Sequence, residues 1–143
     1  MTDTNGPRTV LVIDDEPHVV AYLEMLLQDQ GYATVSAADG REGMEKAQAQ
    51  RPDLICLDIT MPEESGVRMF RNLKEDPALA DVPVLVVTAV TGLGGDPEPF
   101  RNFLSTRTHI APPEGFFSKP IEREKFLEKV QEILARPVEM PSA

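Results

Sequence analysis

Apolar residues fall into short unbroken runs that alternate with longer stretches in which apolar residues recur every three or four positions. Unbroken runs are typical of strands buried on both faces, whereas the three-to-four spacing is typical of helices with one buried side. The runs predict five strands, at residues 9–13, 32–37, 53–57, 84–87 and 115–118. The helical spacing predicts five helices, at residues 17–30, 40–50, 65–75, 97–107 and 122–135.

Strands that alternate with helices predict an α/β fold, here a doubly wound sandwich whose five-stranded parallel sheet is covered by five helices on its two faces. Pro17 suits the first turn of a helix and Gly31 suits a helix end, in agreement with these boundaries. In such folds ligands bind beyond the carboxyl ends of the strands, so the polar residues there are the candidate site residues. They are Asp14, Asp15, Asp58, Thr88 and Lys119.

Length and charge narrow the range of functions. The chain has 143 residues, which suits one domain. We expect this domain at residues 9–136, between a flexible leader (1–8) and a short tail (137–143). The net charge of −10 argues against binding to nucleic acid or to an anionic membrane. No apolar run approaches the roughly 18 residues of a membrane span, and the start lacks the apolar core of a signal peptide, so a cytoplasmic location is expected.

Three carboxylates gathered at one sheet edge repel one another, and a hard divalent cation such as Mg²⁺ or Mn²⁺ resolves that conflict. Lys119 offers an ammonium for a phosphoryl oxygen, and Thr88 offers a hydroxyl donor. One carboxylate can then act as a nucleophile toward phosphorus and form an acyl phosphate. This set therefore predicts phosphoryl transfer, which mainly requires positioning and charge neutralisation.

Four segments in this order resemble the receiver domain of two-component response regulators: VLVIDDEP (10–17), DLICLDITMPEESG (53–66), VLVVTA (84–89) and FFSKP (116–120). The resemblance covers nearly the whole chain and implies a flavodoxin-like fold and a stand-alone receiver rather than an enzyme. It implies that a partner sensor histidine kinase or histidine phosphotransfer protein supplies the phosphoryl group. It also implies that phosphorylation changes a surface that an unknown downstream protein reads.

The resemblance assigns a role to each matched residue. Asp58 matches the phosphoacceptor, and Asp14 and Asp15 match the acidic pair. Asp15, Asp58 and the backbone carbonyl of Thr60 would bind the metal, while Asp14 would act largely through ordered water. Lys119 matches the residue that pairs with the phosphoryl group.

Two further positions match the switch residues of receivers. Thr88 corresponds to the hydroxyl that moves to hold the phosphoryl group, and Phe116 falls at the switch aromatic position, where a core role is the alternative. The Lys119-Pro120 bond is expected to be cis. The segment 89–114 is longer than in ordinary receivers, so the output surface cannot be carried over from the family.

Other residues with reactive side chains are expected to be structural. Cys56 lies within a predicted strand and is expected to be buried packing; as the only cysteine, it excludes an internal disulfide and a multi-cysteine zinc site. His18 and His109 lie far apart and are expected at the surface.

Two alternative functions use the same residues differently. An aspartyl-phosphate phosphatase of the haloacid-dehalogenase type would carry a D-x-D pattern after the first strand, and the chain has Asp14-Asp15-Glu16 there instead. A phosphorylation-independent adaptor would use only the scaffold, and the complete set of site residues argues against it.

Overall fold

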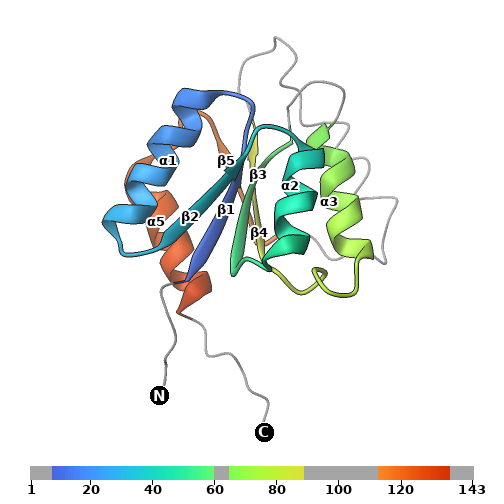
Figure 1. Ribbon diagram of the computed structural model, residues 1–143. Coiled ribbons are helices and arrows are strands. Elements are labelled where there is room, and N and C mark those ends of the chain that lie inside the picture. Colours follow the sequence, from blue (N-terminus) through green and yellow to red (C-terminus); the bar gives the residue numbers. More distant parts are fainter. Residues whose placement is uncertain (1–7, 60–64, 89–112, 136–143) are drawn as a thin grey trace, which may run out of the picture.

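The computed structural model describes residues 8–59, 65–88 and 113–135. Five strands form one parallel sheet in the order β2-β1-β3-β4-β5 (Figure 1). The elements in chain order are β1 (Thr9–Ile13), α1 (Pro17–Asp29), β2 (Ala33–Ala37), α2 (Gly40–Ala49), β3 (Leu54–Asp58), α3 (Ser65–Glu75), β4 (Val84–Thr88), β5 (Gly115–Ser118) and α5 (Arg123–Leu134).

Apart from one polar residue at an end of each, the central strands β1, β3 and β4 are apolar because both faces of the sheet are covered. In Figure 1, α1 and α5 cover one face and α2 and α3 cover the other. Along β1, Leu11 and Ile13 pack into the cluster beneath α2 and α3, whereas Val10 and Val12 pack into the cluster beneath α1 and α5. Strands β3 and β4 alternate in the same way. The unbroken apolar runs arise because alternate residues of a strand point to opposite faces of the sheet, and both faces are buried.

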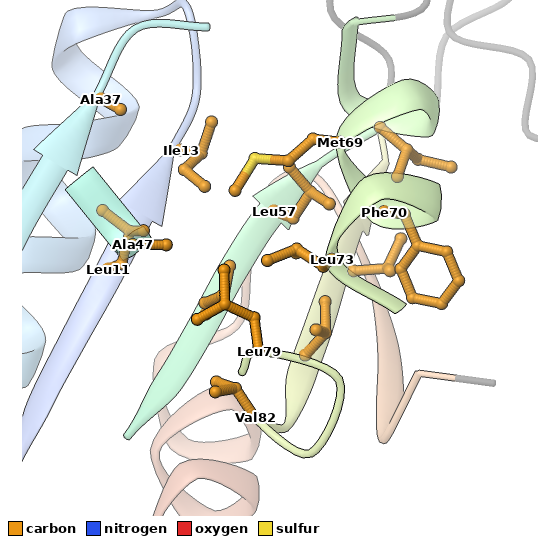
Figure 2. Packing of buried hydrophobic residues seen from close by; sticks show 14 residues of the cluster. Leu11, Ile13, Ala37, Ala47, Leu57, Met69, Phe70, Leu73, Leu79 and Val82 are labelled. Carbon is orange, nitrogen blue, oxygen red and sulfur yellow. The ribbon is translucent and has the colours of Figure 1, made fainter. Parts of the chain in front are cut away.

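The α3 helix contributes the largest side chains of its face. Figure 2 shows Met69, Phe70 and Leu73 of α3 beside Leu57 of β3. Phe70 and Leu73 are 0% exposed, and burial of such a side chain stabilises the fold by about 1.5–3 kcal/mol. The neighbouring α2 packs closely against β1 and α3 because residue 43 is glycine. A Cβ at Gly43 would lie 2.8 Å from both Ile13 Cδ1 and Met69 Sδ.

The predicted elements are confirmed within the described residues, with boundaries that differ by at most a few positions. Asp39 caps α2 by accepting a hydrogen bond from the Glu42 N–H, and Gly31 ends α1 in a left-handed conformation with φ of 92°. Cys56 is buried, as expected. One apolar residue of α1 departs from the expected pattern. The helical spacing of the apolar residues after Pro17, which include Leu23, Met25 and Leu26, predicts that they face the sheet, but Met25 is 51% exposed because it lies on the opposite side of α1 from the buried leucines.

Four of the five predicted helices lie in the described part of the chain. The fourth predicted helix, at 97–107, and His109 lie outside the described residues, as do residues 1–7 of the predicted leader (1–8) and the tail. His18 is exposed, as expected. In the described residues, none of the helices combines the length and the apolar character that a bilayer crossing needs.

Candidate functional site

The sheet register places two carboxylates side by side. Strands β1 and β3 are adjacent and parallel, and Ile13 of β1 is paired with Leu57 of β3. The residue after each of these is an aspartate: Asp14 directly follows β1, and Asp58 is the last residue of β3, so the two lie at the same edge of neighbouring strands. Both are almost fully buried, at 3% and 2% exposure. Two acidic groups are therefore held together at the carboxyl edge of the sheet, as predicted.

The third carboxylate lies at the rim of the same crevice. Asp15 is exposed, in contrast to the two buried aspartates. One carboxylate oxygen from each of Asp14, Asp15 and Asp58 lies within 4.8 Å of the others. Closely spaced carboxylate oxygens, one of them open to solvent, suit a hard divalent cation that keeps several waters. The donor set therefore fits Mg²⁺ or Mn²⁺.

Lys119 brings a positive charge to these carboxylates from two strands away. It directly follows β5, and its side chain reaches back past the end of β4, with only 16% of its surface exposed. Its Nζ lies 3.0 Å from Asp14 Oδ2 and 3.2 Å from Asp58 Oδ2. The peptide bond between Lys119 and Pro120 is cis, as expected from the resemblance.

Burial and charge shift the ionisation of these groups. Burial, followed by the negative charge of Asp58, raises the pKa of Asp14 from 3.8 to about 6, although hydrogen bonds from the Glu16 N–H and from Lys119 act in the opposite direction. Burial alone would lower the pKa of the Lys119 ammonium, but hydrogen bonds to Glu16 and Asp14 and the charge of Asp58 raise it. Lys119 therefore stays cationic at neutral pH, while Asp14 bears an electrostatic penalty when it is ionised.

Sequence reasoning missed a fourth carboxylate. Glu16 Oε1 lies 2.7 Å from Lys119 Nζ, the shortest of the three ion pairs that Lys119 makes with the described residues. The hydrogen bond to the Lys119 ammonium lowers the pKa of Glu16. The only signal in the sequence is that a third acidic residue follows the predicted pair, and nothing in that spacing indicates that it faces a lysine 103 positions away.

The remaining predicted residues are placed less completely. Thr88 ends β4 and is paired with Ser118, the residue before Lys119, so its backbone lies at the same edge as the aspartates. Thr60 lies outside the described residues. Phe116 lies in β5 and is 49% exposed, which does not support the alternative of a fully buried core residue.

Comparison with known proteins agrees with this geometry. The chain matches the family described as "Response regulator receiver domain" over residues 10–131. The polar-differentiation response regulator DivK of Brucella anthropi is 33% identical over 128 residues, which are 90% of this chain and 97% of that protein.

Solved structures share the fold. The chemotaxis protein CheY4 of Vibrio cholerae superposes with a TM-score of 0.74 at 29% identity, over 90% of this chain and 99% of that chain. The receiver domain of a sensor histidine kinase from Pseudomonas aeruginosa PAO1, solved with a magnesium ion coordinated in its active site cleft, gives a TM-score of 0.73 at 22% identity, over 92% and 100%. The family match spans most of the sequence, and the fold agrees with that of the solved structures. The chain therefore belongs to the response regulator receiver domains of two-component signalling, which are signalling modules rather than enzymes.

Proposed function

We propose that the chain accepts a phosphoryl group on Asp58 from a phosphohistidine of a sensor histidine kinase or histidine phosphotransfer protein. The observation that carries this proposal is the arrangement at the carboxyl edge of the sheet. Three carboxylate oxygens lie within 4.8 Å of one another, and the Lys119 ammonium lies 3.2 Å from Asp58. A single acidic group would serve as a cap or a turn former, whereas this set combines a nucleophile, a cation site and a fixed positive charge.

The reaction is expected to depend on Mg²⁺ or Mn²⁺. Asp15 and Asp58, with the backbone carbonyl of Thr60, would bind the ion directly, and Asp14 would hold one of its waters. When bound, the ion would supply positive charge for the phosphoryl oxygens and would offset the repulsion between the carboxylates. The magnesium ion in the receiver of the Pseudomonas aeruginosa kinase supports the same choice of metal here.

In the transfer, a carboxylate oxygen of Asp58 forms a bond to phosphorus while the phosphorus–nitrogen bond of phosphohistidine breaks. The electron pair of the broken bond returns to the imidazole, so the leaving group needs no proton from Asp58. Lys119 is close enough to pair with one oxygen of the transferred group. Positioning and charge neutralisation are thus the contributions of the protein, as is usual in phosphoryl transfer.

Phosphorylation would act through a change of surface. Thr88, at the end of β4, would turn its hydroxyl toward the phosphoryl group, and Phe116 in the adjacent β5 would change its exposure. A downstream protein would read this difference, in the cytoplasm where the kinase presents its phosphohistidine. The receiver itself would span residues 9–136.

The mass of the intact protein tests this proposal. Incubation with acetyl phosphate and Mg²⁺ should add one phosphoryl group to the native chain and none to Asp58→Asn. A matched control is Asp53→Asn, because Asp53 lies at the opposite end of the sheet, where its Oδ2 accepts a hydrogen bond from the Thr9 N–H. This control variant should be labelled like the native chain. Undiminished labelling of Asp58→Asn would refute the assignment.

A further inference from the structure

The ammonium of Lys119 is already saturated before any phosphoryl group arrives. An ammonium has three N–H donors. Three carboxylate oxygens lie within bonding distance of Lys119 Nζ: Glu16 Oε1 at 2.7 Å, Asp14 Oδ2 at 3.0 Å and Asp58 Oδ2 at 3.2 Å. A phosphoryl oxygen that pairs with Lys119 must therefore displace one of these carboxylates.

The three carboxylates differ in how easily they can leave. Asp58 would itself carry the phosphoryl group, so a phosphoryl oxygen takes the place of its Oδ2 beside Lys119. Any further approach of Lys119 to that group is at the expense of Asp14 or Glu16. The Asp14 side chain is 2% exposed, so it would become a buried carboxylate with one partner fewer. Loss of a partner by a buried charge is strongly destabilising. The Glu16 side chain is 47% exposed, so water can replace Lys119 as its partner at small cost. Of the two carboxylates that are not phosphorylated, Glu16 is therefore the one that Lys119 gives up at the smaller cost.

The position of Glu16 in the chain agrees with a dedicated contact to Lys119. Glu16 is the N-cap residue of α1, yet within this fully described helix its side chain accepts no hydrogen bond from the first turn. Its backbone N–H donates instead to Asp14 Oδ1 at 2.9 Å. The backbone of Glu16 is thus held by Asp14, and its side chain is directed toward Lys119 rather than back onto its own helix.

We propose that Glu16 is a positioning residue that holds Lys119 in the unphosphorylated chain and competes with an incoming phosphoryl group for its ammonium. This inference rests on the proposed phosphorylation of Asp58. Glu16 does not touch the reacting atoms. It acts through Lys119. Because Lys119 must give up its contact with Glu16 to approach the phosphoryl group, that contact reduces the stability that Lys119 adds to the phosphorylated state.

The affinity for beryllium fluoride (BeF₃⁻), a tetrahedral stand-in for the phosphoryl group on a carboxylate, tests this inference. Binding is measured by ¹⁹F NMR at fixed Mg²⁺. Glu16→Gln should bind BeF₃⁻ roughly twofold to fivefold more tightly than the native chain, the range expected when a half-exposed ion pair no longer competes. A double variant of Glu16→Gln with Lys119→Met should bind no more tightly than Lys119→Met alone, because Glu16 acts through Lys119.

The matched control is Glu122→Gln. Glu122 is the N-cap residue of α5, also without a side-chain capping bond, and it pairs with Lys125 at 3.7 Å instead of Lys119. The Glu122→Gln substitution removes the same negative charge as Glu16→Gln, at a position three residues after Lys119 in the sequence. Equal tightening in both variants would show a general effect of net charge, and unchanged or weaker binding by Glu16→Gln would show no competition; either result overturns the inference. Failure of the native chain to bind BeF₃⁻ better than Asp58→Asn would instead overturn the proposed function and this inference with it.

Discussion

Strand β3 contains two contrasting regions within five residues. Leu54 to Leu57 are apolar and at most 1% exposed, and they pack against helices on both faces of the sheet. Asp58, one position further, is equally buried but carries a carboxylate that faces two other carboxylates and a lysine. The first four residues therefore stabilise the fold by leaving water, whereas a buried carboxylate at the fifth needs charged partners to offset the loss of its hydration.

The comparison shows that the residues of the candidate site reduce the stability of the fold, whereas those of the interior increase it. In the interior, each side chain removed from water contributes favourably. At the carboxyl edge, the raised pKa of Asp14 shows that its charged form is unfavourable in the fold. A group of this kind persists because it binds something, and in our account that is a divalent cation and a phosphoryl group. Changes in the interior and at the edge should therefore have opposite signs on stability.

The largest effect is expected in the interior. Phe70→Ala removes a ring that is 0% exposed and should lower the free energy of unfolding by about 3–5 kcal/mol, because a cavity is left beside α3 (Figure 2). Urea denaturation at neutral pH measures this loss. Met25→Ala serves as the control, since Met25 is 51% exposed and its loss should change stability by only about 0.5 kcal/mol or less. Similar losses in the two variants would contradict the description of the core.

The boundary between the two regions depends on a glycine. A Cβ at Gly66 would lie 2.2 Å from the carbonyl oxygen of Asp58 and 2.5 Å from the Cα of Ile59, both of which are backbone atoms. Gly66→Ala should therefore destabilise the fold by about 2–3 kcal/mol and weaken Mg²⁺ binding, because the start of α3 must move away from Asp58.

Gly115→Ala is the matched control for this prediction. A Cβ at Gly115 would meet only side-chain atoms, the nearest being Leu85 Cδ2 at 3.1 Å and Lys129 Cε at 3.2 Å, which can adjust. Its effect on stability should be clearly smaller, and its Mg²⁺ affinity should be that of the native chain. Equal effects of the two substitutions on metal binding would mean that the α3 start does not position Asp58.

A smaller effect of opposite sign is expected at the edge. In the metal-free chain the pKa of Asp14 is raised from 3.8 to about 6, so the folded state binds more protons than the unfolded state between these values. Stability should therefore fall as pH rises through this window, and the full cost above pH 6 is up to about 3 kcal/mol. Asp14→Asn removes this cost and should stabilise the metal-free chain at pH 7.5 by about 1–3 kcal/mol.

The pH dependence provides the check. In EDTA, the stabilisation by Asp14→Asn should disappear at pH 4, where Asp14 of the native chain is mostly protonated. The control is Asp29→Asn at the exposed end of α1, a surface substitution that should change stability by only about 0.5 kcal/mol or less in the same experiment. Destabilisation by Asp14→Asn at neutral pH would mean that the contact with Lys119 outweighs the burial of the carboxylate.

The sequence predicted those features that follow from local pattern and from the direction of the strands. Unbroken apolar runs indicated the buried strands, and because parallel strands end at one edge, Asp14, Asp58 and Lys119 could be placed together. The contact between Glu16 and Lys119 could not be predicted, because it depends on where a long side chain from the far end of the chain reaches. The prediction that Met25 faces the sheet was wrong, because the apolar residues of α1 extend around more of the helix than the side that the sheet covers.

Chemical trapping of the acyl phosphate tests the central claim most directly. After treatment with acetyl phosphate and Mg²⁺, borodeuteride reduces a phosphorylated aspartate to a deuterated homoserine, which peptide mass spectrometry assigns to one position. The account predicts homoserine at position 58 and at no other aspartate. Homoserine at position 14, 15 or 53, or phosphorylated protein in which residue 58 remains aspartate, would contradict it.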